Sequence, residues 1–438
     1  MGKLEPFDRL FETFQPTSLA DWQAKVKSDL KLEDIESLNW RDEDGLVHQA
    51  YYHAAQAGTE EQAPLHKEKA YWSILQTYRT EDWSPEELKA HLDLAFANGL
   101  ECAVLISEEY SEAHWSLLDQ SRKKNGQLKY QVKNGLSNAA ITKKQGMLVD
   151  PIARMIVEKA VDRDQIEKLD QYFIKQINSF NMQRFLLVEG SIYGKMGASP
   201  VQELAYCLRH TTEYMDLLTE AGHRADAIFR SLTVNIGIGS AYFQQIAKFR
   251  ALRIVLDRLQ DHYQCKEKIR IWAESNPYYL DHENFNNNLI RLSAQAMSGV
   301  LGMVDRISLS NAGAKKSRKL FADRMLRNIQ LMLKDESRFA KVEDLLSGAY
   351  YIEELSRNMV EESWALFMEM EQRGSLIQEI ENGELFADIN RMDEDRIREF
   401  QKGARVMVGV NKYRHDEAGK GETPDQSSHS ISRKLINS

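Results

Sequence analysis

The chain has 438 residues, of which 42% are hydrophobic and 28% charged, so a sizeable core is available and global disorder is excluded. A formal net charge of −9 argues against a protein that binds nucleic acid through its phosphate backbone. The cysteines Cys102, Cys207 and Cys265 are scattered and form no CxxC pair. They support neither a disulfide framework nor a thiolate zinc site, and they favour a reducing compartment.

The first residues do not resemble a targeting segment. MGKLEPFDRLFETF carries acidic side chains where a signal peptide needs a basic end followed by an apolar core. No apolar run approaches the roughly 20 residues that span a bilayer. We therefore expect a cytoplasmic protein with no membrane-spanning segment.

The N-terminal region, residues 1–40, reads as helical, with aromatic side chains at Phe7, Phe11, Phe14 and Trp22. It is either an arm that packs on another chain or a helix on its own domain. Residues 40–53 predict a short hairpin around Asp44-Gly45, because this dipeptide favours the tight turn of a hairpin.

The next segments alternate between strand and helix patterns. Ser84-Pro85-Glu86-Glu87 is typical of a capped helix start, and this helix is expected to end at Gly99, where glycine adopts the left-handed conformation. A run of apolar and β-branched residues at 227–236 predicts a buried strand, and the spacing after Tyr242 predicts an amphipathic helix. Further strands are expected at 103–106, 139–141, 184–188, 268–273 and 306–309, and further helices at 200–220, 283–300 and 317–334.

Strand–helix alternation of this kind predicts a parallel sheet flanked by helices. An open doubly wound sheet and a closed barrel both fit, and the number of expected strands favours an α/β fold of the (β/α)8 TIM barrel type with an N-terminal helical extension. The expected division is an N-terminal helical arm at 1–40, a barrel at 41–414 and a disordered tail at 415–438, which is polar and rich in glycine and serine.

Few motifs point to chemistry. Gly237-Ile238-Gly239 lacks the third glycine of a dinucleotide fingerprint, and neither a phosphate-binding loop nor an HExxH zinc pair occurs. Glu189 and Glu274 each follow a predicted strand, so both are expected at the C-terminal mouth of a barrel. They are either a general acid/base pair or solvated residues at strand ends.

Several stretches resemble, in order, the methylmalonyl-CoA mutase family. They are YWSILQTYR (71–79), GASPVQELAY (197–206), GIGSAYFQQIAKFRALR (237–253), NFNNNLIRLSAQAMSGVLG (284–302), ADRMLRNIQLMLKDES (322–337), SGAYYIEELS (347–356) and VGVNKYR (408–414). The resemblance implies a TIM barrel that, in active members, encloses an acyl-CoA. It also implies a C-terminal cobalamin domain with a DxHxxG motif in those members, and this sequence contains no such motif.

The chain departs from the family where the resemblance places catalytic residues. The active-site tyrosine of the family aligns with Thr77, and Tyr78 comes one position late. Two family histidines align with Ile192 and Trp272, which cannot donate the same N–H hydrogen bonds from the same geometry. We expect Ile192, Trp272 and the adjacent Tyr193 to fill the barrel axis and exclude substrate.

These losses are typical of the small, non-catalytic chain of bacterial heterodimeric mutases. The resemblance therefore implies a subunit of an isomerase of propionate metabolism, paired with a catalytic large subunit that carries adenosylcobalamin, with no catalytic, cofactor or metal residues in this chain. One alternative is a free-standing acyl-CoA enzyme with Glu189, Glu274 or Tyr78 as catalytic residues. A regulatory acyl-CoA binder is the third.

Overall fold

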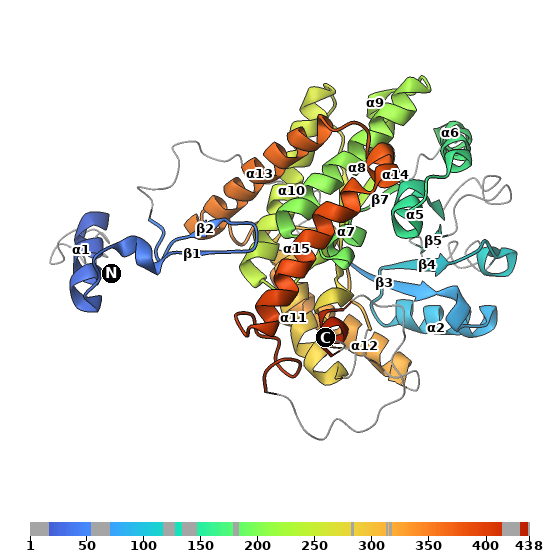
Figure 1. Ribbon diagram of the computed structural model, residues 1–438. Coiled ribbons are helices and arrows are strands. Elements are labelled where there is room, and N and C mark those ends of the chain that lie inside the picture. The colour runs from blue at the N-terminus through green and yellow to red at the C-terminus, as the bar shows by residue number, and fades with distance from the viewer. Residues whose placement is uncertain are drawn as a thin grey trace, which may run out of the picture.

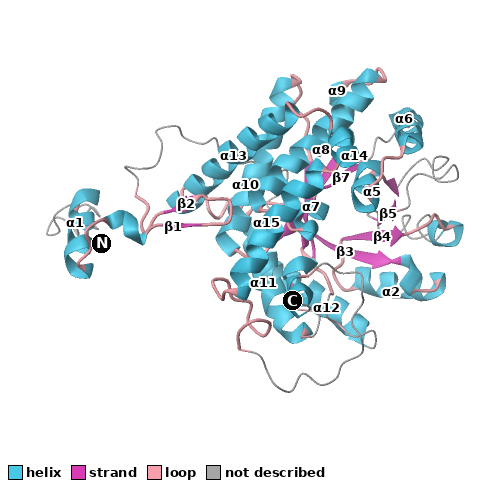
Figure 2. Ribbon diagram, viewed as in Figure 1, coloured by secondary structure: helices cyan, strands magenta, loops and turns pink. Residues whose placement is uncertain are grey.

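The core of the computed structural model is a barrel of eight parallel strands surrounded by helices (Figures 1 and 2). The structure describes residues 17–53, 71–116, 128–133, 147–177, 184–281, 284–311, 314, 318–413 and 430–436. The barrel strands are β3 (Ser73–Arg79), β4 (Cys102–Ser107), β5 (Leu128–Val132), β6 (Met147–Leu148), β7 (Leu186–Glu189), β8 (Leu232–Ile238), β9 (Arg270–Ser275) and β10 (Arg306–Ser308). The expected (β/α)8 TIM barrel is confirmed.

Strand order around the sheet is β6-β5-β4-β3-β10-β9-β8-β7. A parallel bridge between Val149 and Leu186 joins the end of β6 to β7 and brings the two edges of the sheet together. Because both faces of such a sheet are covered, its strands are buried on both sides. In β4, Cys102 and Val104 face the axis, whereas Ala103 and Leu105 pack outward against the helix layer.

Helices connect successive strands on the outside of the barrel. They are α2 (Pro85–Ala97), α5 (Pro151–Glu158), α6 (Arg163–Ile177), α7 (Ser191–Met196), α8 (Pro200–Glu220), α9 (Ala225–Ser231), α10 (Tyr242–His262), α11 (Phe285–Leu301) and α12 (Lys319–Leu331). Short 3-10 segments are η2 (Ile35–Leu38), η3 (Thr80–Asp82), η4 (Pro277–Tyr279) and η7 (Phe339–Lys341), and η6 (Met332–Glu336) is a π-helical turn. The expected capped start at Ser84 is present as a capping box, a second capping box lies at Ser199, and Gly99 has the expected positive φ of 89°.

Further helices follow the barrel: α13 (Tyr350–Glu371), α14 (Leu376–Asn382) and α15 (Glu384–Gln401). Helix α13 packs across α8 and α10, which thickens the helix layer on that side of the barrel (Figure 1). None of the helices in the described part of the chain is long and apolar enough to cross a membrane.

The glycines of the Gly237-Ile238-Gly239 stretch serve packing. Lys248 of α10 donates to the carboxylate of Glu203 of α8 at 2.6 Å and to the carbonyl of Gly237 at 2.7 Å. Glu203 also accepts a hydrogen bond from the amide of Gly237 at 2.7 Å, and a Cβ at this position would lie 2.8 Å from that carboxylate. The absence of a side chain at Gly237 therefore allows the buried Lys248–Glu203 ion pair to hold α8 and α10 against the end of β8.

Some expected elements differ from those observed. Residues 225–231, largely expected as strand, form α9, in which Ile228 and Phe229 are buried while Asp226 lies in the first turn. An amphipathic helical turn thus precedes β8, which begins only at Leu232. Strands β3, β5 and β6 were not expected from the residue pattern, and the strand expected at 139–141 lies outside the described residues.

The polar tail is ordered at its end. Residues 431–436 form α16, and Ile431 is buried with Tyr278, Phe400 and Val410, so the expectation of a disordered tail does not hold for 430–436. Ile431 packs into this cluster and Leu435 packs against it, which the polar composition of the tail did not indicate. Residues 415–429 of the expected tail lie outside the described part.

The expected hairpin is present, with β1 (Trp40–Arg41) paired antiparallel to β2 (Val47–His48). Its acidic tip is bound to the barrel by three carboxylates. Asp42 accepts hydrogen bonds from His48 and Gln244. Glu43 forms ion pairs with Arg396 at 2.8 Å and with Arg405 at 3.0 Å. Asp44 accepts hydrogen bonds from the Ser199 hydroxyl and, at 3.3 Å, from the Val201 amide. The helix α1 (Leu19–Leu30) lies beyond this hairpin, away from the barrel (Figure 1), and has no buried residues.

The tip carboxylates make stability depend on pH. Burial and the neighbouring Glu43 carboxylate raise the pKa of Asp44 from 3.8 to about 7. The folded protein then holds a proton that the unfolded chain releases, so the contribution of Asp44 to stability falls as the pH rises from about 4 to about 7. We predict that Asp44→Asn removes this pH dependence. The free energy of unfolding of the variant, relative to that of the wild type, should therefore rise by no more than about 4 kcal/mol from low to neutral pH.

Denaturant unfolding across this pH range measures the difference. Asp29→Asn on α1 is the matched control, because Asp29 is an exposed carboxylate. Stability curves of wild type and Asp44→Asn that run parallel from acidic to neutral pH would contradict the prediction.

Candidate functional site

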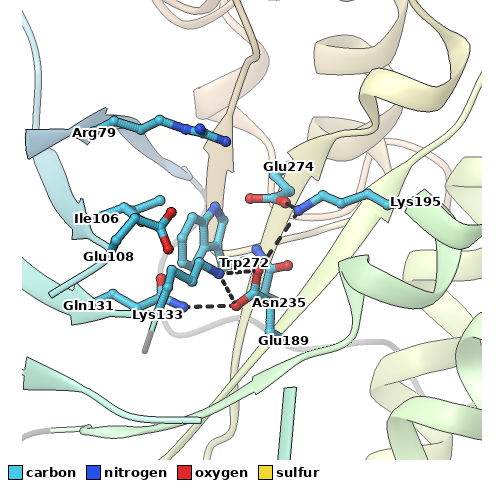
Figure 3. A pocket seen from close by; sticks show the side chains of 10 residues that line it. All are labelled: Arg79, Ile106, Glu108, Gln131, Lys133, Glu189, Lys195, Asn235, Trp272 and Glu274. Atoms are coloured by element: carbon cyan, nitrogen blue, oxygen red, sulfur yellow. Dashed lines mark hydrogen bonds and ion pairs between the residues drawn. The ribbon is translucent and has the colours of Figure 1, made fainter. Parts of the chain in front are cut away.

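A cavity of about 180 Å³ lies at the C-terminal mouth of the barrel (Figure 3). Its walls come from the ends of β3, β4, β5, β7, β8 and β9 and from α7. The lining residues are Arg79, Ile106, Glu108, Gln131, Lys133, Glu189, Lys195, Asn235, Trp272 and Glu274. Axis-facing positions of neighbouring parallel strands meet here, because the side-chain period of two sends alternate residues inward.

Glu189 and Glu274, the two carboxylates expected at the mouth, do lie in the same cavity. Glu189 is 8% exposed and accepts from Gln131 at 2.8 Å and from Lys133 at 2.5 and 2.7 Å. Glu274 pairs with Lys195 and accepts from the Ser191 hydroxyl at 2.8 Å. Lys195 also lies 3.9 Å from Glu189, so its ammonium connects the two carboxylates (Figure 3).

The lysines fix the charge of this network. Burial alone would raise the pKa of Glu189, but Lys133 and Lys195 outweigh it and lower that pKa to about 2. Burial opposes the charge of Lys195, and the two carboxylates outweigh it and raise the pKa of that ammonium. A carboxylate and an ammonium that each hold their charge so firmly are poorly matched to proton transfer near neutral pH.

Trp272 forms the floor of the cavity and closes the barrel axis beneath it. Its side chain is 3% exposed and packs with Leu75, Cys102, Val104, Leu148 and Leu187, which come from four other strands. The expected role of Trp272 as barrel filling fits this position. Ile192 and Tyr193, however, lie in the core between strands and helices, so the expectation that they fill the axis is wrong.

Tyr78, the third candidate from the sequence, lies outside the cavity. Its side chain faces the helix layer, packs edge-on against His91 and donates to Gln76 at 3.0 Å. Burial raises the pKa of Tyr78, which further removes it from acid–base chemistry. Thr77, adjacent in β3, has the opposite orientation because successive strand residues alternate.

The sequence interpretation missed seven of the residues that line the cavity: Arg79, Ile106, Glu108, Gln131, Lys133, Lys195 and Asn235. Lys133 follows β5, a strand that was not expected. Asn235 had a detectable signal, since Thr233, Asn235 and Gly237 place polar or small residues at every second position of the apolar strand β8. That alternation marks the axis-facing side of the strand.

The described residues do not provide a metal centre. Among the described residues, no three or more His, Cys, Asp or Glu side chains lie together in a way that could hold a metal ion. The described lining also contains no histidine that could ligate cobalt, and a cavity of about 180 Å³ is far too small for a corrin ring. The residues present therefore do not fit adenosylcobalamin at this mouth.

The ionised Glu189 should stabilise the fold. Because its pKa is lowered from 4.5 to about 2, its contribution is complete above the unfolded value and is lost as the pH falls through this window. We predict that Glu189→Gln destabilises the protein by about 3 kcal/mol at neutral pH and by less at about pH 3.

Denaturant titrations at both pH values test this prediction. Glu158→Gln is the control, since the Glu158 side chain is 42% exposed and its ion pair with Arg154, one turn away on the same helix, should contribute little. The same loss for Glu189→Gln at both pH values would show that the network does not depend on this charge.

Comparisons with known proteins identify the family to which the chain is similar. The family "Methylmalonyl-CoA mutase" matches residues 147–437. The methylmalonyl-CoA mutase small subunit of Porphyromonas gingivalis is 30% identical over 270 residues, covering 60% of this chain and 44% of that protein. The methylmalonyl-CoA mutase of Cereibacter sphaeroides is 30% identical over 256 residues, covering 57% and 35%. The P. gingivalis large subunit is 28% identical over 250 residues, covering 55% and 35%.

The chain thus spans less than half the length of these relatives. The family match covers well over half of the chain and includes the strands β6 to β10 that carry Glu189, Asn235 and Trp272. It also extends through the helices that follow the barrel. The chain belongs to the methylmalonyl-CoA mutase family.

Proposed function

We propose that this chain is the small, non-catalytic subunit of a cobalamin-dependent methylmalonyl-CoA mutase. It supports a catalytic large subunit, and the complex interconverts methylmalonyl-CoA and succinyl-CoA in the cytoplasm. Adenosylcobalamin resides on the large subunit in this proposal. The existence of separate proteins named small and large subunits in P. gingivalis supports a two-chain assembly.

The position of Trp272 is the observation that carries the proposal. An acyl-CoA enclosed by the barrel needs an open axis, and here the indole packs among the axis side chains of four other strands. The cavity above it, about 180 Å³, is smaller than the roughly 300–1,000 Å³ typical of pockets for organic ligands. A packed axis supports a role in fold and assembly rather than in substrate conversion.

The charge network at the mouth argues against the enzyme alternative. A general acid or base works best with a pKa near the working pH, whereas Lys133 and Lys195 hold the pKa of Glu189 at about 2 in spite of its burial. Glu274 is engaged by Lys195 and Ser191. Both carboxylates therefore act as partners of lysines in this proposal.

The cytoplasmic placement is supported by the cysteines. Cys102, Cys207 and Cys265 are all free and buried. Unpaired thiols suit a reducing compartment.

We predict that the intact chain binds neither methylmalonyl-CoA nor succinyl-CoA in calorimetric titrations, because Trp272 closes the axis. Trp272→Ala should cost about 3–5 kcal/mol of stability through the cavity it creates. Trp40→Ala provides the matched control, since Trp40 is 53% exposed and its removal should cost far less. Micromolar binding of either ester, or a nearly neutral Trp272→Ala, would favour the enzyme or regulatory alternative.

The N-terminal region is the expected contact with the large subunit. Helix α1 has no buried residues, Leu30 is exposed, and Trp22 stacks on the exposed Tyr51 at 4.7 Å. We predict that deleting residues 1–30 weakens co-purification with the large subunit and leaves the thermal unfolding of the barrel unchanged. Full retention of the complex, or unfolding of the shortened chain, would assign the helix to its own domain.

A further inference from the structure

The charges that line the mouth cavity are balanced. Arg79, Lys133 and Lys195 supply three positive charges, and Glu108, Glu189 and Glu274 supply three negative charges. The inner four are engaged with one another through the Lys133–Glu189–Lys195–Glu274 chain. An occupant with a net charge would therefore gain little Coulomb attraction from this lining as a whole.

The two remaining charges lie at the rim and are opposite in sign. Arg79 ends β3, and Glu108 follows the adjacent strand β4, whose Ile106 is in register with Arg79. Both side chains are exposed, and neither forms an ion pair within 4.0 Å with any described residue. Figure 3 shows Arg79 and Glu108 on the same side of the cavity, with the Trp272 indole beside them.

The rest of the cavity lining offers both apolar surface and unused hydrogen-bonding atoms. Ile106 and the Trp272 ring supply a small apolar patch. Both amide atoms of Asn235, a fully buried residue, and the indole N–H of Trp272 have no hydrogen-bond partner among the described residues. Buried polar atoms are normally satisfied by protein, water or ligand, so these atoms indicate that the cavity takes a polar occupant.

The size of the cavity limits that occupant. A cavity of about 150 Å³ is known to hold benzene, which has six non-hydrogen atoms, so the present 180 Å³ admits a molecule only slightly larger. A short α-amino acid has this size. It also carries one positive and one negative charge a few bonds apart.

We propose that the mouth cavity binds a small zwitterion of the α-amino acid class. Its carboxylate pairs with Arg79, its ammonium pairs with Glu108, and its short side chain lies against Ile106 and Trp272. Charge-assisted hydrogen bonds to a planar guanidinium favour a carboxylate at Arg79. This site is independent of the subunit role, because it needs neither an open axis nor a partner chain.

Calorimetric titration of the full chain with L-alanine, lactate and isopropylamine tests the proposal. Lactate keeps the carboxylate and replaces the ammonium with a hydroxyl, and isopropylamine keeps the ammonium and lacks the carboxylate. We expect measurable binding of L-alanine alone, in the millimolar range typical of so small a ligand. Arg79→Ala and Glu108→Ala should each weaken it roughly tenfold or more, as expected when a charge-assisted hydrogen bond is lost.

Both variants change exposed side chains, so they should fold, and thermal unfolding verifies this. Arg224→Ala is the matched control, because this exposed arginine precedes α9 and β8 and so lies at the opposite end of the barrel. Absence of L-alanine binding, or binding of lactate as tight as that of L-alanine, would overturn the proposal. So would an Arg79→Ala variant that binds L-alanine as well as the wild type does.

Discussion

The packing of Trp272 on the barrel axis is the constraint on which the rest of this structure depends. Parallel strands of a closed barrel send alternate side chains inward, and here the inward positions of β3, β4, β6 and β7 surround one indole ring with aliphatic side chains and a thiol. Dense packing at this level separates the polar mouth from the lower barrel. The barrel therefore has a solid middle and a shallow cavity, where an acyl-CoA-enclosing barrel requires a continuous channel.

The charged network at the mouth follows from this closure. With the axis filled below, Glu189 is largely cut off from water, and an ionised carboxylate in such a place needs cationic partners. Lys133 and Lys195 supply them from two different elements, the end of β5 and helix α7. Lys133 and Lys195 also hold the pKa of Glu189 well below its usual range, so closure of the axis and the poor match of Glu189 to proton transfer near neutral pH are physically linked.

The regions outside the barrel are held by a similar use of paired charges. The acidic hairpin tip is bound by Ser199 and Gln244 at the starts of α8 and α10 and by Arg396 of α15. This attachment fixes the base of the N-terminal region while α1 itself extends away from the barrel. An exposed helix that precedes a firmly bound hairpin suits a segment that contacts another chain, which agrees with the proposed role in assembly.

The sequence by itself determined the barrel class, the main helices and the position of two mouth carboxylates, because these depend on local periodicity, on capping residues such as Ser84 and Ser199, and on strand ends. The resemblance to the mutase family also pointed to Trp272 as a replaced catalytic position. Only the tertiary structure decided that Tyr78 faces the helices, that residues 225–231 are helical and that Lys133, Lys195, Asn235 and Arg79 meet around one cavity. The physical reason is that inward or outward orientation in a strand changes with a shift of one residue, and that charges from distant segments become neighbours only when the sheet closes into a barrel.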